Sequence, residues 1–500
     1  MLRLSCRVVG KPCLLLLLVL LTANSALAQL ESATVSGQVV DPSGSSITKA
    51  QVVLVDIDRD TGTSVTTNGS GLYTFQSVRP GRYRMEVTAA GFKVVNITGL
   101  IVNVQDHIEQ NFRLQVGSVA ESVTVTAGAP LVDTTDATVS TVVDRQFAEN
   151  LPLNGRSFQT LIDLTPGVVL TPSTLYDGGQ FSVNGQRAVS NYWMVDGVSA
   201  NIGVSSGFNP GNGFAGTLGA FSAQGGTNGL VSVDAMQEFR IQTSTYAPEF
   251  GRTPGGQISI VTRSGTNRLH GSLFDYFRND VLDANDWFNG YTNTPPLPKA
   301  EERQNDFGGT FSGPVLKDRT FFFFSYEGLR LRLPQTALTN VPDVAARQNA
   351  LPAVQPYLNA YPMPTPGTPD DLAQGIAQFN ATFSSSSTLD AYSLRIDHKL
   401  SDKLSLFGRY NYSPSTIVQR PAALSVISSS DVTIQTSTAG VTWVVSPVAA
   451  DDLRFNYSRT NAGGHNTLDK FGGAVPLASL PFPSPYNSQN AQFALDIRCR

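Results

Sequence analysis

The chain has 500 residues, 35 of them basic and 39 acidic, which gives a formal net charge of −4. A chain of this length exceeds what one hydrophobic core organises, so two or more domains are expected. No cluster of Lys and Arg of the kind that follows a phosphate backbone occurs, which argues against nucleic-acid binding.

The N-terminus has the three parts of a cleavable secretory signal. Arg3, Arg7 and Lys11 precede the apolar run 14–21, and small residues up to Ala28 follow it. The alternative, a membrane-anchoring helix, needs ~20 apolar residues. We therefore predict that residues 1–28 are a signal peptide, cleaved after Ala28.

Cysteine use after cleavage is minimal. Cys6 and Cys13 leave with the signal, and the mature chain keeps only Cys499. An internal disulfide and a thiolate metal site are thereby excluded, and no cofactor is expected.

Residues 29–115 are predicted to form a small β-sandwich. Short apolar runs alternate with Gly, Pro, Asn and Asp, as in strands joined by turns. The order from "SGQVVDPSGSSITKAQVVL" to "GRYRMEVTAAGF" resembles the carboxypeptidase regulatory-like domain, a transthyretin-like sandwich. This resemblance implies a periplasmic accessory module, sometimes associated with carbohydrate binding, although no residue pattern indicates a sugar site.

One acidic stretch of this region resembles a calcium loop. Asp56, Asp58 and Asp60 alternate as oxygen ligands would, but Thr61 stands at the position of the EF-hand Gly and Thr67 at that of its Glu. We predict a solvated hairpin loop and no metal site.

Residues 136–264 are predicted to form a mixed α/β domain. Short apolar helices broken by Pro152 and Pro166 lead into segments rich in glycine. "LPLNGRSFQTLIDLTPGV", "VNGQR" followed by "MVDGV", and the long segment around "EFGRTPGGQISIVTRSGTN" together resemble the plug and first barrel strand of Oar-like TonB-dependent outer-membrane receptors. The resemblance covers nearly all of residues 32–500.

The pattern of residues 265–500 is typical of an outer-membrane barrel. In the hairpin 390–413, one face carries Tyr392, Leu394 and Ile396, and the other carries Arg395 and Asp397. Long connections at 279–302 and 334–388 alternate with turns as short as Ser401-Asp402, an asymmetry that a soluble sheet does not explain.

Two details of this region qualify the pattern. Phe321 and Phe323 share a face with Glu327 and Leu329, so we expect a bulge to reset the alternation. Aromatic residues are expected at strand ends, as interfacial girdles: Tyr410, Tyr412, Trp443 and Tyr457.

The number of strands is small for a barrel that holds a plug. About eight candidate strands can be counted, and a barrel of eight strands encloses only side chains. The overall fold class is therefore mainly β: an N-terminal sandwich, an α/β plug and the first part of an antiparallel transmembrane barrel, apparently truncated.

The linker 116–135 contains a candidate coupling strand. Ser122, Val123, Thr124, Val125, Thr126 and Ala127 are extended and β-branched, compatible with a strand of the sandwich or with a strand offered to a partner. Its position before the plug favours the second interpretation.

The resemblance implies a TonB-dependent receptor or transporter in the outer membrane of a Gram-negative bacterium, in contact with outer-membrane lipid and energised by a TonB-like partner. The expected cargo is an unidentified saccharide, peptide or chelate. Aromatic side chains in a glycine-rich plug loop and in the first long barrel loop are the expected ligand contacts: Phe208, Phe214, Phe221, Trp287, Phe288 and Tyr291.

Two other functions compete with transport. The first is a non-transporting adhesion or surface-binding protein with a carbohydrate-binding-like accessory domain. The second, an enzyme of the carboxypeptidase type, lacks a zinc-binding His-Glu-His set, so no catalytic residue is predicted.

Overall fold

The computed structural model describes residues 32–117, 122–126, 138–150, 159–170, 181–187, 190–202, 218–219, 222–223, 227–246, 250–251, 253–289, 296–368, 370–371, 374–421, 424–446, 449–479 and 482–487. Strands dominate these residues, which confirms the mainly β class. No helix in these ranges is long and apolar enough to cross a membrane.

The N-terminal sandwich consists of two sheets that enclose one core. One sheet holds β4 (Leu72–Val78), β1 (Ala33–Val40), β7 (His107–Glu109) and β8 (Phe112–Arg113). The other has the order β3 (Thr61–Thr66), β2 (Gln51–Asp56), β5 (Gly81–Thr88), β6 (Val94–Val102) and β9 (Ser122–Thr126). Alternate residues of the strands, such as Val35, Val52 and Met85, are fully buried between the sheets.

The acidic stretch forms the turn between β2 and β3, as predicted. The carboxylate of Asp56 accepts hydrogen bonds from the backbone N–H groups of Asp58 and Arg59 at 2.9 and 3.1 Å. Sequence patterning missed β3 and β6, because each exposes many of its side chains and alternates poorly.

The plug is built on a mixed five-stranded sheet with the order β10 (Val139–Asp144), β17 (Met236–Ser244), β18 (Gln257–Thr262), β13 (Tyr192–Val195) and β14 (Val198–Ser199). Only the β13–β18 pair is parallel. Short elements surround the sheet: α2 (Arg145–Asn150), α3 (Gln159–Ile162), β11 (Val168–Leu170), β12 (Phe181–Val183), β15 (Asn201–Ile202), β16 (Leu218–Gly219), η3 (Thr227–Gly229) and η4 (Val233–Ala235).

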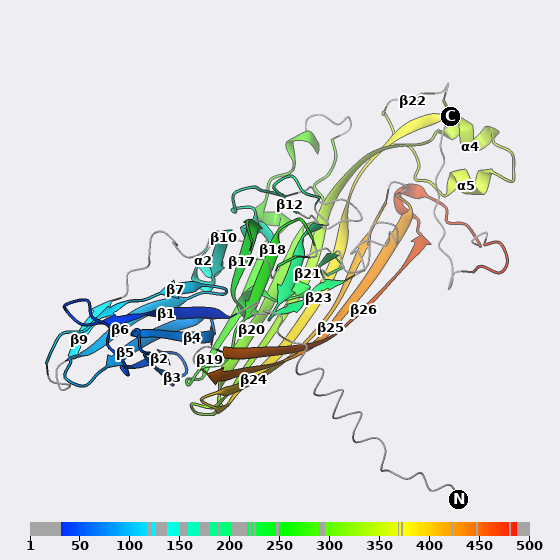
Figure 1. Ribbon diagram of the computed structural model, residues 1–500. Helices are drawn as coiled ribbons and strands as arrows, with labels where there is room; N and C mark the ends of the chain where they lie inside the picture. The colour runs from blue at the N-terminus through cyan, green and yellow to red at the C-terminus, as the bar shows by residue number, and fades with distance from the viewer. Residues whose placement is uncertain are drawn as a thin grey trace, which may run out of the picture.

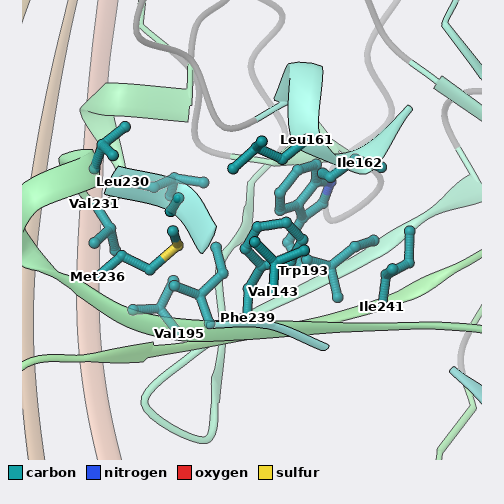
Figure 2. Packing of buried hydrophobic residues seen from close by; sticks show 14 of the residues in the cluster. Val143, Leu161, Ile162, Trp193, Val195, Leu230, Val231, Met236, Phe239 and Ile241 are labelled. Atoms are coloured by element: carbon teal, nitrogen blue, oxygen red, sulfur yellow. The ribbon is translucent and has the colours of Figure 1, made fainter. Parts of the chain in front are cut away.

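The plug core packs around two aromatic rings. Figure 2 shows Trp193 and Phe239 among aliphatic side chains from α3, β17 and the segment before η4. Phe181 meets Trp193 edge to face, with 5.6 Å between ring centroids. The same buried cluster includes Phe323, Val432 and Ile434 of the third region, so the plug shares its core with the barrel wall.

The third region is one antiparallel sheet, here called the barrel sheet. Its order is β19 (His270–Asn279), β20 (Arg303–Leu316), β21 (Thr320–Pro342), β23 (Ile376–Ser401), β24 (Leu404–Gln419), β25 (Val426–Ser446) and β26 (Ala449–Leu468), with β22 (Asp370–Asp371) beside β23. Among the described residues β19 and β26 do not pair with each other, so the sheet is open. The predicted last strand, near residues 491–498, lies outside the described residues.

The strands of the barrel sheet are much longer than the sequence predicts. β21 has 23 residues, which corresponds to about 75 Å of strand. The prediction of a loop over 334–388 is wrong, because Leu333–Pro342 pair with Ile376–Ser385 as antiparallel strands. Only the residues between these two segments leave the sheet, and they contain α4 (Val344–Asn349) and α5 (Gln355–Asn359). One face of the extension is apolar, since Val341, Phe379 and Leu424 form a small buried cluster. The alternation of Ala377, Phe379, Ala381 and Phe383 with polar residues was a usable strand signal.

The two faces of the barrel sheet differ as the pattern of the hairpin 390–413 predicts. Tyr392, Leu394 and Ile396 are 41–45% exposed on the outer face, whereas Arg395 and Asp397 are buried on the inner face. The inner polar side chains contact the plug and not an open lumen.

The expected bulge near Phe323 is absent, because the pairing of β21 with β20 stays in register from Pro314–Phe321 to Arg303–Arg332. Phe321, Phe323, Glu327 and Leu329 all face inward and are buried. Phe323 packs in the plug core, and Glu327 accepts a hydrogen bond from Asn228 of η3. The plug therefore provides partners for both the apolar and the polar side chains of the inner face.

Aromatic rings form a ladder across the outer face. Neighbouring ring centroids are 6.1 Å apart for Phe307–Tyr326, 4.8 Å for Tyr326–Tyr392 and 6.4 Å for Tyr392–Tyr412. The prediction of strand ends is wrong for Tyr410, Tyr412 and Tyr457, which lie in the middle of β24 and β26. Trp443 lies near the end of β25, as predicted.

The sandwich lies at the end of the barrel sheet where the strands are joined by short turns, and α4 and α5 lie at the opposite end (Figure 1). Two such turns are Lys317–Arg319 and Asp402–Lys403. We call this end the short-turn rim.

Neighbouring phenylalanines on opposite faces of β21 test the shared core. Phe323→Ala should lower the free energy of unfolding by about 3 kcal/mol, because it opens a cavity between plug and barrel sheet. Phe324→Ala, on the outer face, should have a smaller effect. Urea unfolding in detergent, followed by Trp193 fluorescence in a Trp287→Phe, Trp443→Phe background, measures both, and equal losses would contradict the shared core.

Candidate functional site

The candidate site is a buried polar cluster where the plug meets β23 and β24. Asp196 of the plug is only 1% exposed. Its carboxylate accepts a hydrogen bond from Arg395 Nη1 at 2.8 Å, and Arg409 Nη1 lies 3.9 Å from its other oxygen. Two barrel arginines thus neutralise one plug carboxylate in a region that excludes water.

A tight turn of the plug orients Asp196. Val195 pairs with Val198, and Asp196 and Gly197 between them have φ of 50° and 77°. A two-residue hairpin with both φ positive favours Asp-Gly, because few other residues adopt this conformation without strain. The Asp196 carboxylate is also bonded by Thr262 of β18, through the backbone N–H at 3.0 Å and the hydroxyl.

Arg395 is shared between plug and barrel. It donates to Asp397 through Nε at 2.9 Å and Nη2 at 3.0 Å, while Nη1 serves Asp196 and Thr262. Its guanidinium also lies 4.5 Å from the ring centre of Phe407. A planar group with five donors suits this forked arrangement better than lysine does.

Further contacts hold the plug against β24. Arg409 donates to the carbonyl of Leu230 at 2.8 Å, and Asn411 to that of Gly229 at 3.2 Å. The backbone N–H of Ala223 donates to Ser415 at 2.8 Å. Each contact uses a polar side chain of the inner face, so the plug is held by bonds that can be broken and remade.

A second set of buried contacts joins the sandwich to the plug. Glu238 of β17 is 3% exposed and accepts a hydrogen bond from the backbone N–H of Val104. Burial raises the pKa of Glu238 to about 8, against the lowering effect of the Val104 hydrogen bond. Asp106 of the sandwich forms an ion pair with Arg240 beside it.

The predicted coupling residues occupy the edge of the sandwich. Ser122–Thr126 form β9, which pairs in parallel with β6 from Val94–Ser122 to Thr98–Thr126. The segment thus has the strand conformation of the first interpretation. Ala127 lies outside the described residues, and its role in coupling stays a prediction.

Of the predicted ligand contacts, Trp287 and Phe288 are described, with side chains 60% and 66% exposed. Their rings meet edge to face at 5.3 Å, in the connection between β19 and β20. Phe208, Phe214, Phe221 and Tyr291 lie outside the described residues. No group of His, Cys, Asp and Glu suited to a metal ion occurs in the described part of the chain.

Sequence reasoning missed the cluster around Asp196. Arg395 and Asp397 were placed on one face of the hairpin, but nothing in the pattern showed that the plug would cover them. The Asp-Gly pair between apolar residues was a usable hairpin signal.

Comparison with known proteins agrees with this architecture. Residues 34–115 match the carboxypeptidase regulatory-like domain, and residues 261–352 and 348–496 match an outer membrane beta barrel domain. Over 343 residues the chain is 28% identical to the TonB-dependent transporter Oar of Myxococcus xanthus, covering 66% of this chain and 30% of that protein. The chain is a homologue of TonB-dependent transporters of the Oar type. Its location is the Gram-negative outer membrane.

Two solved structures are similar to parts of this Oar homologue. The outer membrane transporter YddB of Escherichia coli has a TM-score of 0.44 at 15% identity, covering 66% of this chain and 40% of YddB. The siderophore receptor PirA of Acinetobacter baumannii has a TM-score of 0.35 at 13% identity, covering 66% of this chain and 45% of PirA. The chain thus spans less than half of each of these relatives.

Removing the plug carboxylate tests the buried cluster. Asp196→Asn should destabilise the seated plug by about 3 kcal/mol, because it removes the negative charge that lies between Arg395 and Arg409 in a buried site. Asp451→Asn, an exposed aspartate of β26, is the matched control. Hydrogen exchange of β17 and β18 should rise only in Asp196→Asn, and unchanged exchange would contradict the role of the cluster.

The raised pKa of Glu238 predicts a dependence of stability on pH. The neutral carboxyl fits the buried site, so its contribution is complete below the ordinary value of 4.5 and is lost as the pH rises through about 8. Glu238→Gln should flatten the decline of Tm between pH 5 and 8, whereas Glu109→Gln, an exposed control, should not. Parallel curves for the wild type and Glu238→Gln would refute the assignment.

Proposed function

We propose that the Oar homologue is part of an active transporter that admits a bulky ligand past its plug, powered by a TonB-like protein of the inner membrane. The observation that carries the proposal is the seating of the plug. Inner-face side chains of β23 and β24 hold it through Asp196, Leu230 and Gly229. A plug held by polar contacts inside a barrel wall can be displaced without unfolding the wall, which a surface adhesion protein does not require.

The proposed point of energy input is β9. In the described part of the chain, β9 pairs with β6 alone, so its second edge carries no neighbouring strand. A strand from a partner can add to this edge, or replace β6, through main-chain hydrogen bonds. Such pairing depends on the backbone of residues 122–127 more than on their side chains.

The proposed ligand contacts lie at the end opposite the sandwich. Trp287 and Phe288 present two exposed rings there, and stacking on rings suits saccharides, aromatic peptides and aromatic chelates alike. We therefore propose a bulky ligand of one of these classes, in a protein that makes or breaks no bond.

A backbone substitution separates transport from adhesion. Val125→Pro removes an N–H donor from β9, and Val125→Ala keeps it. Cells should bind a labelled maltodextrin, peptide or ferric catecholate equally well with either variant, but uptake should fall by about tenfold or more with Pro alone. Deletion of residues 121–128 should have the same effect as Pro. Binding without uptake in the wild type would favour adhesion.

A further inference from the structure

The sandwich is seated on the plug and on the barrel sheet through three separate sets of contacts. The first joins the β4–β5 turn to the barrel sheet, where Arg79 Nη1 donates to Asp397 Oδ1 at 2.8 Å. Asp397 is the same carboxylate that holds Arg395. One chain of charges therefore leads from Arg79 of the sandwich, through the buried Asp397 and Arg395 of the barrel sheet, to Asp196 of the plug.

The second set of contacts follows directly after β6. Gln105 donates to Ser259 Oγ at 2.9 Å and accepts from Gln242 at 2.8 Å. Val104 and Asp106 on either side bind Glu238 and Arg240. All the side chains of β17 and β18 in this set are at most 6% exposed.

The backbone of Gln105 supports a fixed seat. Its φ is 61°, in the left-handed region that residues other than glycine, asparagine and aspartate seldom adopt. Such a conformation persists where the surrounding contacts determine it. The two buried side-chain hydrogen bonds of Gln105 and its unusual backbone both indicate one specific docked position, and not a loosely tethered domain.

The third set lies at the outer part of the rim. The backbone N–H of Asn267, just before β19, donates to the carbonyl of Asp58 at 3.1 Å. On the other side, Ser77 Oγ donates to Asp452 Oδ2 of β26 at 3.0 Å. The sandwich therefore spans the rim from β19 to β26.

We propose that the sandwich is a cap on the periplasmic rim that holds the plug in place, and that the cap must leave its seat before the plug can move. The need for plug movement rests on the proposed transport function, but the seat itself does not.

The chemistry of the seat is compatible with reversible release. When Arg79 leaves, Asp397 keeps Arg395 as its partner, so no unpaired charge stays buried in the barrel sheet. Arg79 is already 31% exposed and returns to water easily. Glu238, whose pKa burial raises, regains solvent and can ionise.

The cap is also connected to the proposed coupling strand. β9 is hydrogen-bonded along β6, and β6 leads within three residues to Val104 and Gln105. A pull on β9 is therefore applied to the strand that ends at the plug contacts. Release of the cap would expose β17 and β18, the strands beneath it.

A covalent link across the rim tests whether the cap must leave. Ser77 and Asp452 are in hydrogen-bond contact, so Ser77→Cys and Asp452→Cys, in a Cys499→Ser background, can be joined by a short thiol-reactive linker that reduction cleaves. The control pair is Ser43→Cys with Asp452→Cys, because Ser43 contacts Asp41 and Ser45 of its own turn and not the barrel sheet. Uptake of the labelled panel should fall by about tenfold or more in the linked protein and return on reduction, with binding unchanged. Full uptake in the linked protein would overturn the proposal.

Hydrogen exchange tests the cap even if the chain transports nothing. Arg79→Glu places a negative charge against Asp397 and should raise the exchange rate of β17 and β18 by about tenfold or more. Arg113→Glu is the matched control, because Arg113 is an exposed residue of β8 and belongs to none of the three sets of contacts. Faster exchange in Arg79→Glu alone supports the cap, and unchanged plug exchange in Arg79→Glu overturns it. Absent uptake in the unlinked wild type would count against transport and not against the cap.

Discussion

The arrangement of this chain depends on one buried arginine. Arg395 faces inward from β23 and bonds Asp397 beside it and Asp196 of the plug. Charges removed from water are stable only when they are paired and hydrogen-bonded. Satisfying this group ties together the plug, through Asp196, and the sandwich, through Asp397 and Arg79.

The barrel sheet shows how one strand serves two environments. Its outer face presents apolar and aromatic residues, while its inner face mixes phenylalanine with glutamate and arginine. The mixture is stable because the plug supplies a matching surface: a hydrophobic core for Phe323 and an amide for Glu327. Beyond the aromatic ladder the strands continue as an extension with a small apolar cluster of its own, formed by Val341, Phe379 and Leu424.

The sandwich is more than an appended module in this structure. Its β6 carries the candidate coupling strand on one edge and leads to the plug contacts at its end. An accessory domain with this placement lies between the proposed coupling strand and the plug. Polar contacts at the seat favour an interface that forms and breaks, as in transient domain interfaces.

Sequence alone predicted the secretory signal. It also determined the mainly β class, the order of the three regions and the two faces of the barrel strands. These features are local, since they depend on composition, short turns and a period of two. Only the tertiary structure decided the length of β21 and β23, the absence of a bulge at Phe323, and the contacts of Asp196, Arg395 and Gln105. The physical reason is distance along the chain. Asp196 and Arg395 are 199 residues apart, and the sequence around one charged side chain does not indicate which residue it will pair with.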